Sequence, residues 1–145
     1  MTLASVAPMH ELTEEALIAA SIDEVWRDLT DPAVLAEWIW PPRFETSAVI
    51  DPTPQGPWEV RSEIAEMAVI GRVLVAEPSR ELRLKWRWEG EEHTTDVEIT
   101  LDPVADDATR IIVHHTGFQT DEERESHIEG WSNCLERLVE RHAPA

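Results

Sequence analysis

Two histidines and one cysteine are the side chains of this sequence that could do chemistry near neutral pH. His115 ends a stretch of alternating apolar residues, whereas His127 and Cys134 lie seven positions apart in a stretch with helical spacing. Either histidine could exchange hydrogen bonds or act as a general acid or base. A zinc site built from all three is conceivable, but no CxxC or HExxH spacing occurs, so we predict no metal and no cofactor.

Motifs of common catalytic sites do not occur in the sequence. We find no GxSxG, no paired cysteine and histidine nucleophile arrangement and no glycine-rich phosphate loop. The apolar faces of the predicted strands carry almost no carboxylate. An acid–base enzyme of the cyclase or dehydratase type, using His115 or His127, therefore stays an alternative, and we assign no catalytic residue.

The first third of the chain predicts a strand followed by two short helices. Residues 11–20 lead into the strand, which we expect to end near Ala20. The segment Ser21–Glu24 is a capping box, with serine at the N-cap and glutamate at N3. Asp31 can cap a second helix because proline follows at its first position, and Pro41 and Pro42 stop that helix.

From about Phe44 onward, apolar and polar residues alternate in six segments separated by turns. A period of two indicates strands with one buried face, and the short turns imply an antiparallel meander. The predicted inward residues are Trp58, Val60, Ser62 and Ile64, then Val69, Gly71, Val73 and Val75, then Leu82, Leu84, Trp86 and Trp88, then Val97, Ile99 and Leu101, and finally Ile111, Val113 and His115.

A long amphipathic helix follows Thr120 and is the only large element available to cover the apolar face of the sheet. Thr120–Glu123 forms a second capping box, and the helix carries Gly130 in its interior. Glycine costs a helix interior about 1 kcal/mol relative to alanine. We interpret Gly130 as a sign that this helix lies over a hollow, where a strand or a ligand approaches it closely. We expect residues 1–145 to form one domain, with residues 1–10 as a loose arm.

Composition excludes several classes of partner. The formal net charge is −18, and Lys85 is the only lysine. Clustered lysine and arginine bind nucleic acids and anionic membranes, so neither is an expected partner. Cys134 is the only cysteine, so no intramolecular disulfide is possible. The N-terminal residues lack a signal peptide pattern and no apolar run is long enough to span a membrane, so we expect a cytoplasmic location.

Five segments, in order, resemble the START-like superfamily, also called SRPBCC. They are IAASIDEVWRDLTDPAVLAEWIWP, GPWEV, LRLKWRWEG, VEITLDPVADDATRIIVHHTGF and HIEGWSNCLERL. They look most similar to bacterial homologues of the activator of the ninety-kDa heat-shock-protein ATPase. The resemblance implies an α+β helix-grip fold: an antiparallel sheet of six to seven strands curved around a long C-terminal helix, with two short helices after the first strand.

The resemblance also implies a deep, largely apolar cavity between sheet and helix. Relatives bind lipids, sterols, polyketides or plant hormones, and homodimers recur among the bacterial members. We predict an intracellular binding protein for a small hydrophobic or aromatic molecule held in a closed cavity. A chaperone-ATPase regulator acting through protein contacts stays an alternative. The residues predicted to line the cavity are Trp38, Phe44, Trp58, Val60, Trp86, Trp88, Val97, His115, His127, Trp131 and Cys134.

Overall fold

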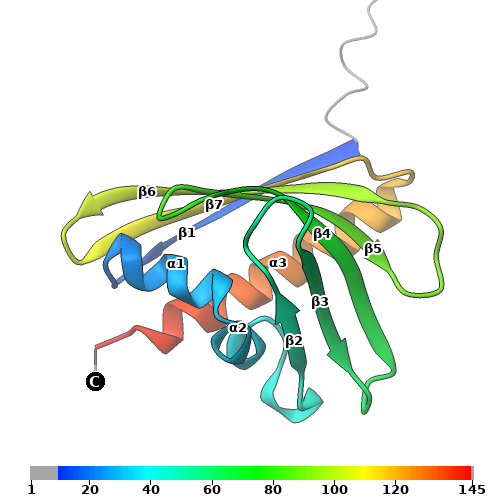
Figure 1. Ribbon diagram of the computed structural model, residues 1–145, viewed down its shortest axis with the longest axis horizontal. Helices are drawn as coiled ribbons and strands as arrows, with labels where there is room; N and C mark the ends of the chain where they lie inside the picture. Colours follow the sequence, from blue (N-terminus) through cyan, green and yellow to red (C-terminus); the bar gives the residue numbers. More distant parts are fainter. Residues whose placement is uncertain (1–9, 145) are drawn as a thin grey trace, which may run out of the picture.

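A single antiparallel sheet of seven strands curves around the C-terminal helix (Figure 1). The computed structural model describes residues 10–144. Its elements are β1 (Glu11–Ile18), α1 (Ile22–Thr30), α2 (Pro32–Trp38), the 3-10 helix η2 (Pro42–Phe44), β2 (Ser47–Ile50), β3 (Pro57–Ser62), β4 (Met67–Glu77), β5 (Glu81–Trp88), β6 (Thr95–Ala105), β7 (Ala108–Thr116) and α3 (Asp121–Arg141).

The strand order is β1-β7-β6-β5-β4-β3-β2, so the last six strands form the predicted meander and β1 pairs with the last of them. Helix α3 lies on the concave side of the sheet, and α1 and α2 lie on the same side (Figure 1). This arrangement confirms the predicted α+β helix-grip fold. The apolar core lies between the concave face and the three helices, because the inward residues of the strands are buried there.

Capping bonds begin both α1 and α3, but the second cap differs from the prediction. At α1 the Ser21 hydroxyl accepts from the Glu24 N–H at 3.2 Å, and the Glu24 carboxylate accepts from the Ser21 N–H at 3.3 Å. At α3 the Thr120 hydroxyl accepts from the Glu123 N–H at 3.1 Å. The Glu123 carboxylate instead accepts from the Gln119 N–H at 3.3 Å. The second bond of the predicted capping box therefore comes from the N–H of Gln119, one residue before the N-cap, instead of from the N–H of Thr120.

Strand alternation predicts most of the buried positions; among the predicted inward residues, Gly71, Val75 and Trp88 are half-buried and Ile64 is exposed. Ile64 is 59% exposed, because β3 ends at Ser62 and the chain turns before β4. Val75 is half-buried, because a register shift between Val73 and Val75 interrupts the pairing of β4 with β5. A β-bulge of this kind changes the side to which the following residues point. Both corrections concern local breaks that a regular period cannot indicate.

The first described residue is tied to the fold rather than loose. His10 Nδ1 lies 2.8 Å from the carbonyl oxygen of Phe118, and the His10 carbonyl accepts from the N–H groups of Gly117 and Phe118. The rest of the predicted arm, residues 1–9, lies outside the described residues. The strand that follows His10 is β1, and it ends at Ile18, earlier than the predicted end near Ala20.

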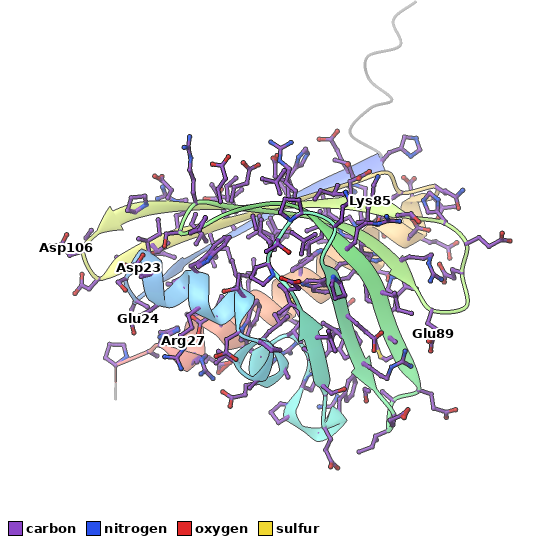
Figure 2. All side chains as sticks on the ribbon, in the orientation of Figure 1. Asp23, Glu24, Arg27, Lys85, Glu89 and Asp106 are labelled. Carbon is purple, nitrogen blue, oxygen red and sulfur yellow. The ribbon has the colours of Figure 1, made fainter. Side chains whose placement is uncertain are left out.

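The labelled charged side chains project outward from the ribbon (Figure 2). Lys85 projects from the face of the sheet away from α3, and its ammonium group lies 2.6 Å from an Asp96 carboxylate oxygen. Asp23, Glu24 and Arg27 project from α1. Within residues 10–144, no helix has both the length and the apolar character that crossing a membrane requires.

Two glycines should respond in opposite directions to replacement by alanine. A Cβ on Gly71 in β4 would lie 1.8 Å from the Lys85 carbonyl oxygen, so Gly71→Ala must push β5 away. We expect that overpacking to destabilise the fold by roughly 1–3 kcal/mol. A Cβ on Gly130 in α3 meets no atom within 4 Å, so Gly130→Ala should stabilise the fold by about 1 kcal/mol. Chemical denaturation of both variants measures the two shifts, and equal signs would contradict this account.

Candidate functional site

An aromatic cluster lies between the sheet and α3. Trp86 of β5 lies at its centre, with ring centroids 5.4 Å from Trp58, 6.0 Å from Trp88 and 5.3 Å from Trp131. The His115 ring meets Trp86 edge-on at 5.3 Å. Tilted and edge-to-face pairs of this kind each contribute about 0.5–1.5 kcal/mol beyond the apolar area they bury. Aromatic rings therefore occupy the part of the interior around Trp86, next to an otherwise mainly aliphatic core.

A chain of hydrogen bonds fixes the His115 ring within this cluster. The indole N–H of Trp131 donates to His115 Nδ1 at 3.0 Å. Because an indole nitrogen can only donate, we assign the His115 proton to Nε2, which lies 2.7 Å from the Thr95 hydroxyl. The Thr95 hydroxyl in turn donates to the Trp86 carbonyl at 3.3 Å. Both ring nitrogens of His115 are thus engaged, and the chain joins α3 to β7, β6 and β5.

His115 is held neutral by its surroundings. The pKa of His115 is lowered to about 2, chiefly by burial and to a smaller extent by the proximity of His127 and His114. The side chain is inaccessible to solvent. A general base needs a free lone pair within reach of a substrate, and His115 offers none.

His127 is also occupied at both nitrogens. Its Nδ1 lies 2.7 Å from the Glu123 carbonyl oxygen, which can only accept, so we assign the proton to Nδ1. His127 Nε2 then accepts from the Trp88 indole N–H at 3.0 Å. Protonating His127 would break the bond to Trp88, because Nε2 would become a donor. The arrangement favours a structural, neutral imidazole facing the pocket.

Cys134 lies on the inner face of α3 as a protonated thiol. Burial raises the pKa of the Cys134 thiol to about 12, and its Sγ lies 3.6 Å from the Trp131 carbonyl oxygen. A thiol in this state is a poor nucleophile and a poor metal ligand. Among residues 10–144, no group of three His, Cys, Asp or Glu side chains is placed to hold a metal ion.

A pocket of about 270 Å³ remains beside the aromatic cluster, between α3, β5 and the segment after α2. Three of its residues, Ser126, Gly130 and Asn133, are exposed on α3, so the pocket opens to solvent there. This corrects the expectation of a closed cavity. The pocket is lined by Ile39, Trp40, Pro41, Met67, Trp86, Trp88, Ser126, His127, Gly130, Trp131, Asn133, Cys134 and Arg137.

The structure places the predicted lining residues in two groups. Those that line the pocket are Trp86, Trp88, His127, Trp131 and Cys134. Those buried in the core outside it are Trp38, Trp58, Val60, Val97 and His115. Phe44 is half-buried on η2 and packs against Trp40, outside the pocket lining. Trp58, Val60, Val97 and His115 lie on the inward face of the sheet, whereas Trp38 lies on α2.

Sequence reasoning selected the wrong tryptophan from the WIWPP segment. The Trp38 indole donates to the Asp28 carbonyl at 3.0 Å, which directs the Trp38 ring toward α1. Trp40 instead stacks on Trp88, with ring planes 8° apart and centroids 6.2 Å apart. The two prolines that stop α2 place Trp40 at the pocket wall. The two prolines indicated that a tryptophan lies where the chain leaves α2, but they did not specify whether the Trp38 ring or the Trp40 ring turns toward the pocket.

Arg137 is one of the lining residues that sequence reasoning missed, together with Ile39, Trp40, Pro41, Met67, Ser126 and Asn133. Arg137 follows Cys134 by three positions, so both side chains lie on one face of α3. Its Nε donates to the Trp38 carbonyl at 2.9 Å, and its Nη2 donates to the Ile39 carbonyl at 3.0 Å. Carbonyls at the C-terminal end of a helix have no N–H partner within the helix, and an arginine side chain often donates to them. Arg137 therefore holds the pocket wall, and burial lowers its pKa.

The fold and this pocket define a helix-grip protein with an aromatic-lined opening beside its C-terminal helix. The sequence matches the family described as activator of Hsp90 ATPase homolog 1-like protein over residues 19–143. The chain belongs to this family, as the sequence resemblance predicted. No curated protein matches the sequence.

Solved structures share the fold at low sequence identity. Protein MLL2253 from Mesorhizobium loti is 20% identical, with a TM-score of 0.77 over 90% of this chain and 94% of its own. Protein CV1439 from Chromobacterium violaceum is 22% identical, with a TM-score of 0.77 over 94% and 99%. The HSP90 activator PFC0360w from Plasmodium falciparum is 14% identical, with a TM-score of 0.73 over 89% and 93%. At sequence identities this low, the TM-scores show a shared fold and nothing more specific.

The buried His115 should make stability depend on pH. Its pKa is about 2 in the folded chain and 6.5 in the unfolded chain, so between these values the unfolded chain binds more protons. Stability therefore falls as pH drops below about 6.5, by about 2 kcal/mol at pH 5 for this group alone. Denaturation of the wild type and of His115→Gln at pH 7.5 and 5 should show this difference in pH dependence. Ring chemical shifts of His115 that change between pH 7.5 and 5 would contradict it.

Proposed function

We propose that the protein binds a small aromatic molecule in the pocket beside α3. The observation that carries this proposal is the lining: four tryptophans, Trp40, Trp86, Trp88 and Trp131, contribute to one opening. Binding sites for small molecules combine apolar and aromatic walls with a few polar groups that set orientation. Flat indole faces suit a flat ring system, which can stack on them as Trp40 stacks on Trp88.

The size of the pocket limits the ligand. A volume of about 270 Å³ corresponds to roughly nine water molecules, or on the order of ten non-hydrogen atoms. This volume is slightly below the usual range of about 300–1,000 Å³ for ligand sites. One or two fused rings with a short substituent suit it better than a sterol or a long-chain lipid.

Gly130 supports a pocket that is kept open. No atom lies within 4 Å of a Cβ built on Gly130, so packing does not require glycine there. Any larger side chain would project at the pocket edge, since Gly130 is a lining residue exposed to solvent. The cost of glycine in the helix is offset if an unobstructed opening is needed for a ligand.

Trp86 adds a polar feature to the wall. Its indole nitrogen is buried and has no hydrogen-bond partner among the described residues. A buried donor without an acceptor costs about 1–3 kcal/mol. A bound molecule that carries an acceptor, with a small shift of the Trp86 ring, would remove this cost.

The test is binding of a neutral probe, 2-naphthylmethanol, followed by tryptophan fluorescence and calorimetry. We expect Gly130→Leu to weaken binding by about tenfold or more, because the new side chain occupies the opening and removes contact area. The matched control is Ser132→Leu, which adds the same group to an exposed position of α3 outside the lining. We expect the control to bind like the wild type.

Two results would contradict the proposal. One is the absence of saturable binding of the naphthalene probe to the wild type. The other is equal binding by wild type and Gly130→Leu, which would place the probe elsewhere. Stimulation of a chaperone ATPase that is unchanged in Gly130→Leu would favour the protein-contact alternative that the family description suggests.

A further inference from the structure

We propose that the pocket selects an aromatic molecule with a carboxylate, which pairs with the Arg137 guanidinium. This inference rests on the proposed binding function and specifies the class of ligand. It arises from the charges of the lining residues and from the unused donors of Arg137. The net charge of the chain would not suggest it, because an acidic protein repels anions at a distance.

The pocket lining excludes acidic side chains. The chain carries 30 Asp and Glu residues among 145, yet none of them lines the pocket. The lining contains one charged group, Arg137, together with the polar side chains of Ser126, His127 and Asn133. The hydrogen bonds of His127 identify it as a neutral imidazole. The pocket is therefore locally positive on a molecule that is strongly negative overall.

Arg137 has N–H groups that make no hydrogen bond to the described residues. A guanidinium has five N–H groups, and two of those of Arg137 donate to the carbonyls of Trp38 and Ile39. Among residues 10–144, no carboxylate lies within 4.0 Å of its guanidinium, although six other arginines have such a partner: Arg27, Arg61, Arg80, Arg83, Arg110 and Arg141. The remaining donors suit a carboxylate, which accepts two parallel bonds from this group.

The charges around Arg137 also leave room for an anion. Burial is the main influence that lowers its pKa, and the positive charge of Arg43 adds to it. Glu136 and Glu140 act in the opposite sense, but both are exposed neighbours on α3 and form no ion pair with Arg137. A half-buried cation without a close counter-ion is stabilised when a ligand supplies one.

The position of Arg137 gives the ligand a direction. The lining residues of α3 extend from Ser126 to Arg137, roughly 16 Å at the rise of an α-helix. Arg137 lies at one end, against the carbonyls at the end of α2, and Trp86 and Trp131 contribute the aromatic wall. The carboxylate would thus lie beside the end of α2, and the rings would extend toward the tryptophans.

The experiment compares three probes that share one ring system: 2-naphthoate, 2-naphthylmethanol and 2-naphthylmethylammonium. We expect calorimetry to show that the wild type binds naphthoate about tenfold more tightly than the alcohol, and the ammonium compound most weakly. Arg137→Gln should remove this preference: loss of its bonds to the Trp38 and Ile39 carbonyls weakens the binding of both probes, but naphthoate loses about tenfold more affinity than the alcohol. Arg137→Lys, which keeps the charge without the planar donor pair, should retain part of the preference.

The matched control is Arg124→Gln. Arg124 lies on the same helix and also donates to a backbone carbonyl, that of Glu11 at 2.6 Å, but it does not line the pocket. We expect it to leave the affinities of all three probes unchanged.

The outcomes separate this inference from the binding function. Equal affinity of the wild type for the three probes would overturn anion selection and leave the aromatic pocket standing. Equal weakening of naphthoate and alcohol in Arg137→Gln would also overturn it, because Arg137 would then act only by holding the wall. Absence of binding by all three probes would contradict the proposed binding function itself.

Discussion

The buried hydrogen-bond chain from Trp131 through His115 and Thr95 to the Trp86 carbonyl positions the rest of the interior. It links the long helix to three strands, and each member uses a donor or acceptor that has no contact with water. Removing one member would leave a buried polar group without a partner, which is more costly than losing an ordinary bond. The chain sets the distance of α3 from the sheet, and hence the size of the space beside it.

That space is small because tryptophan side chains are large. Trp58, Trp86 and Trp131 occupy the centre of the space between sheet and helix, and the open pocket lies at one side. One wall of the pocket is the segment after α2, which Arg137 holds through two backbone carbonyls. One residue of α3 therefore both fixes the shape of the pocket and gives it a positive charge.

Much of the fold could be predicted from local patterns. The capping residues Ser21 and Thr120 indicated where helices begin, and alternation indicated the buried faces of the strands, because both depend on backbone geometry within a few residues. Ile64 and Val75 departed from the prediction where a turn and a bulge interrupted the period. Gly130 indicated open space beside α3, although no strand approaches it.

The sequence alone indicated most of the residues that face inward, since side-chain direction follows the period of each element wherever that period is uninterrupted. It could not specify which inward residues border empty space, because that depends on how neighbouring rings orient and fill volume. Trp38 and Trp40 illustrate this: a bond to the Asp28 carbonyl turns one toward α1, and stacking on Trp88 holds the other at the pocket. The protonation of His115 and the free donors of Arg137 likewise depend on partners distant in sequence, which come together only when the chain folds.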